Sequence, residues 1–310
     1  MNLNVDPTGF FIKVIGQTSL SALNFLTKKK PLGESVWLPR IQKYFDGKDS
    51  IIHGVYSRLP IVKTNDDKTI ALTKTQESNI EKERQKIADH PTHSNDPHLI
   101  LEPEYIPNWE GNPVIFKTIP ADYATVRVLK SSDMPIKTLS AGALLLCEEN
   151  KSLILHKRSE DSDTYPNYYH LVGGSYMPKT AQTMRYNDGG SLKKTAIREI
   201  WEELGIISVN LDPCTMLMQE EPDTGFIQLC FLGASVSKDQ LSKIDENYEG
   251  EFQEVEFNHL AKLLNDDERL VPTCKSAILS WLALDTPGTR ISPTFGGMKP
   301  KQLFKKITSA

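Results

Sequence analysis

The chain is poor in cysteine. Its 310 residues include only four, Cys147, Cys214, Cys230 and Cys274, and no two of them form a close pair. A zinc ribbon, whose cysteines come in close pairs, is therefore not expected. So few cysteines in a chain of this length are typical of reduced thiols. The first 30 residues also lack the basic start, apolar centre and small-residue cleavage site of a signal peptide, so we expect a cytoplasmic protein.

Long apolar runs and an excess of positive charge are also missing. No stretch reaches the roughly 18 apolar residues of a membrane span, so we expect no membrane partner. The net charge of −4 excludes a broad basic footprint, and DNA is not an expected partner. The lysines at 28–30 and within 299–306 are interpreted as solvated surface groups. With 39% hydrophobic and 25% charged residues, the chain can bury a core and is predicted to be globular.

Residues 1–135 carry weak patterns, and we interpret them as a separate α+β region. The pattern predicts a strand at 10–15, a short helix at 19–28, an extended piece at 51–62 broken by Gly54 and Pro60, and a polar helix from a cap at Ser78 through Ala88.

Two features of this region leave alternatives open. His90, His93 and His98 lie in a stretch rich in turn formers, which predicts a solvated loop rather than a metal site. Trp37 and Trp109 could form a wall of a substrate pocket, or could belong to the core of this region.

After Pro135 the pattern sharpens. Apolar runs predict strands at 139–147, 152–158, 168–174 and 226–236, a strand or strand end at 254–260, and a turn at 148–151 between the first two strands. They also predict a helix that includes Ala196 and stops at Gly205, and a second helix from Pro272 to about Leu284. Strands interleaved with helices predict an α/β domain over 136–285. The segment 286–310, rich in proline and glycine, is a predicted tail.

The first of these helices is crowded with carboxylates. Glu199, Glu202 and Glu203 fall within an arc of about 100°, Arg198 lies inside the cluster, and Gly205 ends the helix. An apolar stripe lies roughly 120° away on the same helix and consists of Leu192, Ala196, Ile200 and Leu204. A plain solvated acidic face is one interpretation. The other is a binding site for a divalent cation, because Mg²⁺ prefers oxygen ligands and is usually held by a few carboxylates together with substrate phosphates.

Residues 198–206, REIWEELGI, resemble the second half of the Nudix box, the signature of the Nudix hydrolase superfamily. In the family this half is Arg-Glu-aliphatic-any-Glu-Glu-any-Gly-aliphatic. Two predicted strands, the pair Gly173-Gly174 and a loop precede it, as in the family. The resemblance implies a Nudix-type α/β/α sandwich with a mixed sheet over 136–285, in addition to the N-terminal α+β region.

The first half of the box departs from the family pattern. Arg198 follows Gly174 by 24 positions, where the family has 14, so the intervening loop holds ten extra residues. Gly190 stands where the box has a glutamate, and Val172 where many members have proline. Asp188 in the loop could replace the missing carboxylate, or the loop could cover the substrate.

The resemblance implies a metal site and a catalytic set. Glu199, Glu202 and Glu203 resemble the metal ligands, and the carbonyl oxygen of Gly173 would complete the metal shell. Arg198 resembles the arginine that pairs with and orients one of these glutamates.

A further glutamate of the family comes from a later loop. Glu251, six positions before Phe257, fits that spacing and could bind the metal or act as the base that activates water. Glu249 and Glu254 are nearby alternatives, and an ordinary polar loop residue is the other interpretation of Glu251.

Three residues are assigned to substrate binding. Arg158 ends a predicted strand, and its fork suits phosphate oxygens, although a surface ion pair is the alternative. Gly174 begins the box. Tyr168 is the tyrosine assigned to stack on a base or ring. Core packing is the alternative for Tyr168 and for its neighbours Tyr165, Tyr169 and Tyr176.

The resemblance implies hydrolysis, dependent on Mg²⁺ or Mn²⁺, of the diphosphate bond in a nucleoside diphosphate linked to another moiety, such as a nucleotide sugar or a dinucleotide. Metal ions lower the pKa of bound water, and a carboxylate removes the remaining proton. The alternative, motivated by Gly190 and the long loop, is a catalytically weak or inactive Nudix module that senses a nucleotide or RNA. The expected partner is a small nucleotide. Added segments in this superfamily often shape substrate choice or build dimers, so the resemblance implies that residues 1–135 are an accessory region for substrate recognition or dimerisation, and a homodimer is a further expectation.

Overall fold

The computed structural model describes residues 50–89, 95–111, 113–132, 136–160, 164–177, 191–244, 250–266 and 269–284, together with 134, 162, 302, 304 and 305. Several predictions therefore lie outside the described residues. These are the strand at 10–15, the helix at 19–28, the assignments of Trp37, His90, His93, Asp188, Gly190 and Glu249, and nearly all of the tail at 286–310.

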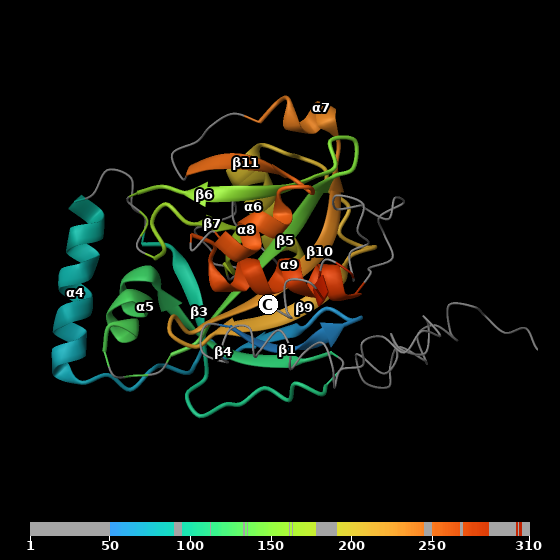
Figure 1. Ribbon diagram of the computed structural model, residues 1–310. Coiled ribbons are helices and arrows are strands. Elements are labelled where there is room, and N and C mark those ends of the chain that lie inside the picture. Colours follow the sequence, from blue (N-terminus) through green and yellow to red (C-terminus); the bar gives the residue numbers. More distant parts are fainter. Residues whose placement is uncertain are drawn as a thin grey trace, which may run out of the picture.

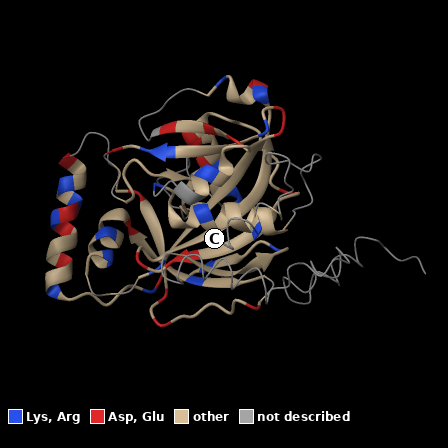
Figure 2. Cartoon of the chain, in the orientation of Figure 1, with Lys and Arg blue, Asp and Glu red and all other residues tan. Residues whose placement is uncertain are grey.

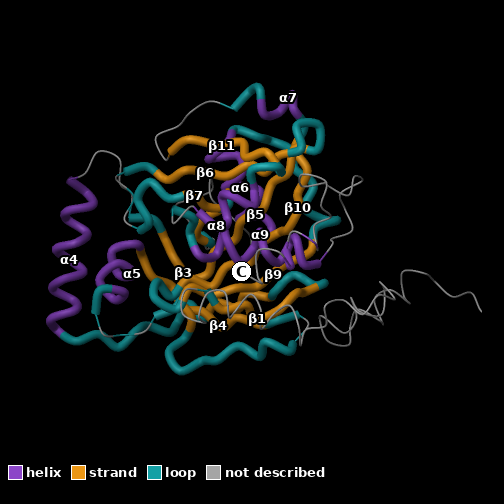
Figure 3. Tube along the Cα trace, viewed as in Figure 1, coloured by secondary structure: helices purple, strands orange, loops and turns teal. Residues whose placement is uncertain are grey.

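One mixed sheet organises the described residues (Figures 1 and 3). Its strands are β1 (Ile51–Tyr56), β2 (Ile61–Thr64), β3 (Pro97–Leu101), β4 (Ile115–Asp122), β5 (Thr138–Cys147), β6 (Ser152–Arg158), β7 (Tyr169–His170), β8 (Val172–Ser175), β9 (Thr215–Glu221), β10 (Phe226–Val236) and β11 (Gly250–Glu256). The main order is β1-β9-β10-β5-β3-β4-β2, while β8 and β6 pair with β5, and β7 and β11 pair with β6. The pairing of β10 with β5 is parallel, and that of β9 with β10 is antiparallel.

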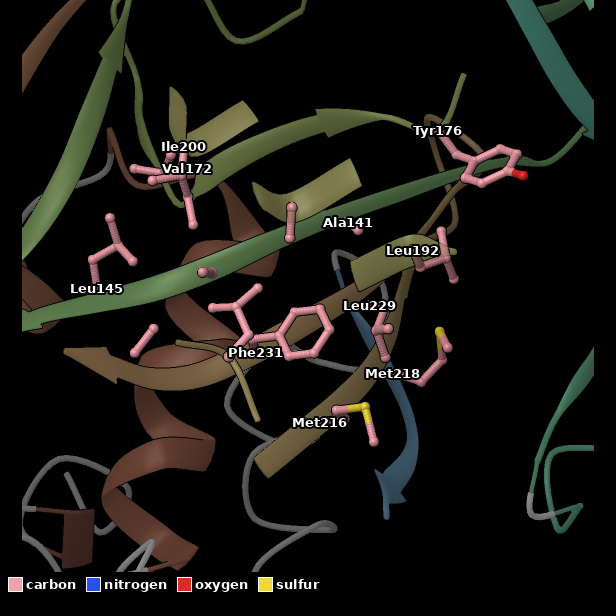
Figure 4. Packing of buried hydrophobic residues seen from close by; sticks show 14 of the residues in the cluster. Ala141, Leu145, Val172, Tyr176, Leu192, Ile200, Met216, Met218, Leu229 and Phe231 are labelled. Carbon is pink, nitrogen blue, oxygen red and sulfur yellow. The ribbon is translucent and has the colours of Figure 1, made fainter. Parts of the chain in front are cut away.

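Helices cover the two faces of the part of this sheet that follows residue 136. Helix α6 (Leu192–Leu204) packs on β5 and β8, whereas α8 (Leu260–Asp266) and α9 (Pro272–Leu284) cover the opposite face (Figure 1). Figure 4 shows the core on the α6 side, where Ile200 of the helix lies near Val172 of β8. A short helix, α7 (Lys238–Leu241), follows β10. This arrangement is the predicted α/β/α sandwich.

The residues before β5 extend the same sheet. Strand β1 pairs with β9 along the sheet edge, and Ile100 of β3 pairs with Thr138 of β5. Phe116 of β4 is fully buried in the core that α6 covers, and Trp109 packs against that core with its ring stacked on His53 at 3.6 Å between centroids. The region is thus α+β, as predicted, and its strands continue the sheet. The division at residue 135 stays a prediction.

Two helices of this region lie side by side at one edge of the molecule. They are α4 (Lys74–Asp89) and α5 (Tyr123–Lys130), and α4 contains residues of both charge signs (Figure 2). The predicted cap at Ser78 is wrong, because α4 begins at Lys74 and Ser78 lies inside it. Thr73 takes that place instead: its hydroxyl accepts from the Gln76 N–H while its own N–H donates to the Gln76 side chain. None of the helices in the described ranges has the length and apolarity of a membrane span.

Candidate active site

Helix α6 carries its carboxylates into the protein rather than away from it. The helix ends where Gly205 adopts φ 67°, a left-handed conformation that glycine tolerates well, and the N–H of Gly205 donates to the carbonyl of Trp201. Glu199 and Glu203 are one helical turn apart and buried, with 9% and 5% of their side chains exposed. Glu202 is more accessible, at 21%. The solvated-face interpretation is therefore wrong for Glu199 and Glu203.

Arg198 is the positive group within this cluster. One terminal nitrogen lies 2.7 Å from Oε1 of Glu199 and 2.6 Å from Oε2 of Glu202, and the other donates to the carbonyl of Ser175 at 2.8 Å. The guanidinium side chain is 9% exposed, so solvent screens these contacts weakly. Arg198 thus joins α6 to the end of β8 and fixes the direction of two of the three carboxylates.

Glu203 is held by the backbone instead. Its Oε2 accepts from the N–H of Gly173 in β8 at 3.2 Å, and its Oε1 lies 3.6 Å from Nδ1 of His156. One carboxylate oxygen is therefore anchored at the paired glycines while the other points towards a buried imidazole.

Both glycines of β8 lie so close to neighbouring atoms that a side chain would not fit there without a shift. A Cβ on Gly173 would lie 2.4 Å from Cα of Gly142 in β5, so the two strands leave no room for a side chain there. A Cβ on Gly174 would lie 2.5 Å from the carboxylate carbon of Glu199. The Glu199 carboxylate therefore rests directly on the backbone of Gly174, and the structure brings the paired glycines together with the acidic helix.

Two histidines that the sequence did not single out as site residues lie beside Glu203. His156 of β6 and His170 of β7 face each other across the strand pair, with Nδ1 of His156 3.0 Å from Nε2 of His170. Burial and, to a smaller extent, the nearby charge of Arg158 lower the pKa of His156 to about 4. Burial, followed by the charges of His156 and Arg158, lowers the pKa of His170 well below its usual value. Both imidazoles are therefore neutral at pH 7.

Arg158 lies on the same side of the sheet as His156. Side chains alternate along a strand, so residues 154, 156 and 158 of β6 share the face that α6 covers, where Ile154 belongs to the core. The Nε of Arg158 is buried without a hydrogen-bond partner among the described residues. The ion pair considered as its alternative is not seen for this atom.

Glu251 is not brought to the acidic helix. In the antiparallel pairing of β11 with β6, Glu251 lies opposite Lys157, and its Oε2 is 3.7 Å from the ammonium group of Lys157. Lys157 alternates with His156 and so faces the side of α9, where Leu153 and Leu155 join the core. The Glu251 side chain is 63% exposed. Its role as a ligand or base stays a prediction.

The alternative Glu254 and the tyrosines are also placed elsewhere. Glu254 accepts from the hydroxyl of Ser152 at the far end of β6. Tyr168 and Tyr165 pack against the core on the α9 side, with ring centroids 5.5 Å apart. Tyr176 is buried in the core on the α6 side, as the packing interpretation predicts. His98 is buried in β3, so the loop predicted around it is wrong at that residue.

Comparison with known proteins identifies one family over part of this chain. The family model described as the NUDIX domain matches residues 137–280, which includes β5 to β11, α6 and most of α9. A search of curated proteins found no match.

Several solved structures are similar to this part of the chain. The MutT protein from Methanosarcina mazei Go1 is 24% identical with a TM-score of 0.33, over 45% of this chain and 88% of that chain. An Ap4A hydrolase from C. elegans is 17% identical with a TM-score of 0.33, over 47% of this chain and 97% of that chain. A bifunctional NMN adenylyltransferase/ADP ribose pyrophosphatase from Francisella tularensis, complexed with AMP and a Mn ion, is 14% identical with a TM-score of 0.35, over 50% of this chain and 44% of that chain.

Proposed function

We propose that the chain is a divalent-metal-dependent pyrophosphohydrolase of the Nudix hydrolase type, because the NUDIX domain model matches residues 137–280. Its proposed substrate is a nucleoside diphosphate linked to another moiety, as in a nucleotide sugar or a dinucleotide. The observation that carries the proposal is the contact of Glu199 and Glu203 with Gly174 and Gly173. The proposed location is the cytoplasm, and the four cysteines are all free thiols.

The donors at this site fit a hard divalent cation. Three carboxylates and one guanidinium leave a local charge of −2, since three negative charges are offset by one positive charge. Mg²⁺ and Mn²⁺ prefer such oxygen ligands and complete their shells with water and substrate phosphates. A cation held by these carboxylates would supply charge neutralisation of phosphate oxygens and a bound water of lowered pKa.

The protein contributes position and proton transfer. Arg198 and the Gly173 N–H hold the carboxylates of Glu199, Glu202 and Glu203 in fixed directions, which reduces the reorganisation needed during the reaction. We assign Glu202 and Glu203 to the metal. Glu202, the most exposed of the three, is also our choice for the base that takes the proton from the attacking water.

Arg158 is proposed to bind a phosphate oxygen of the substrate. Its Nε is buried without a partner in the described part of the chain, and an unsatisfied buried donor is costly unless a ligand accepts from it. The guanidinium fork matches phosphate geometry. Gly174, which has no side chain to obstruct an approach, is proposed to lie against the substrate.

A panel of nucleotide sugars, dinucleotides and ADP-ribose, each with Mg²⁺ or Mn²⁺, tests the proposal. Released nucleoside monophosphate is detected by chromatography, and a parallel reaction contains EDTA. We expect release from at least one member of the panel, dependent on metal and abolished by EDTA. Absence of any release with either metal would contradict hydrolysis.

The position of Glu251 favours a second candidate, a Nudix module that binds a nucleotide without cleaving it. In the described part of β11, the pairing turns Glu251 towards the α9 side, so this carboxylate does not supplement those of α6. A thermal shift with ADP-ribose, with and without Mg²⁺, combined with product detection, separates the two candidates. Binding without cleavage across the panel would favour the sensor.

We expect Gly174→Ala to impair turnover more than stability. The new Cβ would meet the Glu199 carboxylate at about 2.5 Å, and this flexible end of a side chain can move aside. Moving it breaks the contact with Arg198, so we expect turnover to fall by about 10- to 100-fold, as when a group that orients a metal ligand is lost. The free energy of unfolding, measured in urea, should fall by less than about 1.5 kcal/mol. A variant with unchanged turnover would show that Glu199 need not occupy its observed position.

A further inference from the structure

Two buried histidines outside the acidic cluster and one buried glutamate of that cluster converge on a small space. His156, His170 and Glu203 each offer one ligand atom, and these atoms lie within 4.8 Å of one another. The three residues are 2%, 8% and 6% exposed. The Nudix box supplies only Glu203, while both imidazoles come from β6 and β7. The hydrolysis proposed above makes no use of them.

The backbone fixes this arrangement. His156 and His170 are directly opposite each other in the antiparallel pair of β6 and β7, so their side chains leave the sheet on the same face. Glu203 reaches them from α6, and because its Oε2 is held by the Gly173 N–H, its Oε1 is left facing Nδ1 of His156. Three separate elements thus hold the donors before any ligand arrives.

The distances suit a small transition-metal ion. Nδ1 of His156 is 3.0 Å from Nε2 of His170 and 3.6 Å from Oε1 of Glu203. Zinc binds imidazole nitrogen and carboxylate oxygen at about 2.0–2.2 Å, so two ligands of a tetrahedral ion lie roughly 3.4 Å apart. These two separations lie on either side of that value, and the ligand atoms of His170 and Glu203 are within 4.8 Å of each other. Side-chain rotations would bring the three donors into range.

The chemistry of the donors selects the class of ion. Imidazole nitrogens are good ligands for Zn²⁺ and similar transition metals, whereas Mg²⁺ strongly prefers oxygen. A neutral imidazole binds a metal through the ring nitrogen that carries no hydrogen. With the hydrogens on Nε2 of His156 and Nδ1 of His170, the two nitrogens that face each other, Nδ1 of His156 and Nε2 of His170, are both available as ligands.

We propose that His156, His170 and Glu203 form a buried transition-metal site of the Zn²⁺ class. This site is distinct from the proposed Mg²⁺ or Mn²⁺ position at Glu202 and Glu203. The two positions share Glu203, with Oε1 directed to the histidines and Oε2 to the paired glycines. The site rests on the proposed function only through this shared residue. An ion held there would fix the Glu203 carboxylate in place. The affinity of the Nudix-box carboxylates for Mg²⁺ or Mn²⁺ would then depend on whether the histidine site is occupied.

Zinc binding by the full-length chain tests the site. The protein is stripped with EDTA, loaded with ZnCl₂, dialysed and analysed by mass spectrometry of metals, and its affinity for Zn²⁺ is measured by competition with a chromophoric chelator. We expect about one zinc per chain in the wild type, retained when Mg²⁺ is in large excess. His170→Gln should weaken Zn²⁺ binding by about 100-fold or more, since it removes one of three ligands. Wild-type protein that retains no zinc overturns the site without any variant.

Two comparisons make the result specific. His259→Gln changes an exposed histidine outside the cluster and should leave zinc content unchanged, so equal losses in His259→Gln and His170→Gln would overturn the proposal. Glu202→Gln should abolish the proposed hydrolysis but keep the zinc. Wild-type protein that binds zinc but hydrolyses no substrate would contradict the proposed function and leave the zinc site standing. Wild-type protein that hydrolyses a substrate but binds no zinc would contradict the zinc site alone.

Folding of the variant is checked independently. If His170→Gln does not fold, the visible spectrum of the wild-type protein loaded with Co²⁺ takes its place. A four-coordinate site with two imidazole ligands gives intense absorption bands, and we expect them. Weak bands typical of six oxygen ligands would overturn the site.

Discussion

Glu203→Gln is expected to reduce metal-dependent turnover by about 10²- to 10³-fold, the cost of losing one charged group that stabilises a transition state. Glutamine keeps the shape of the side chain, and its amide oxygen can still accept from the N–H of Gly173, which the carboxylate oxygen accepts from at 3.2 Å. What it removes is the negative charge that the proposed cation requires. The loss is measured as kcat at saturating Mg²⁺ with the substrate that the panel identifies.

The control for this variant is Glu77→Gln, the same substitution at an exposed position on α4. It should leave kcat unchanged, while the thermal unfolding temperatures of both variants should stay close to that of the wild type. Equal rates for Glu203→Gln and the wild type would show that Glu203 is not a ligand of the catalytic cation, and that it is buried only for packing.

Gly173→Ala is expected to destabilise the fold by about 3 kcal/mol or more, at the upper end of the range for overpacking. Its Cβ would lie about 2.4 Å from Cα of Gly142 and about 2.5 Å from the carbonyl oxygen of Ala141. Both neighbours are backbone atoms of β5, so neither can rotate away as a side chain could. The two strands must separate, which also withdraws the Gly173 N–H from Glu203. Urea unfolding followed by circular dichroism measures the change.

Gly205→Ala provides the matched comparison. Gly205 adopts φ 67°, and a Cβ there meets nothing within 4 Å, so only the left-handed conformation is penalised, by about 1–2 kcal/mol. Comparable destabilisation by the two alanines would show that the close approach of β5 and β8 is not the reason for glycine at 173.

The sequence predicts well where an element is strongly apolar along its length. The strands at 152–158 and 226–236 and the helix at 272–284 agree with β6, β10 and α9. Strand β9 was missed because its sequence ends in two glutamates. Glu220 is paired with His53 and Lys137, and Glu221 accepts from Thr273. These partners lie far away in the sequence, so local pattern could not show that the carboxylates are buried.

The same distinction applies to the candidate site. The acidic helix and the paired glycines are local patterns, and the fold brings them together. His156 and His170 depend on the register of β6 with β7, and the direction of Glu251 depends on the register of β11 with β6. A shift of one residue would turn each of these side chains to the other face. Their only sequence signal was a histidine within each of two neighbouring predicted strands.

Anomalous diffraction from crystals soaked in Mn²⁺ is the most direct test of the cation on the acidic helix. We predict a manganese peak within bonding distance of the carboxylates of Glu202 and Glu203, beside Gly173. A manganese peak elsewhere, with these carboxylates keeping their present contacts with Arg198 and the backbone of β8, would contradict the proposed metal site.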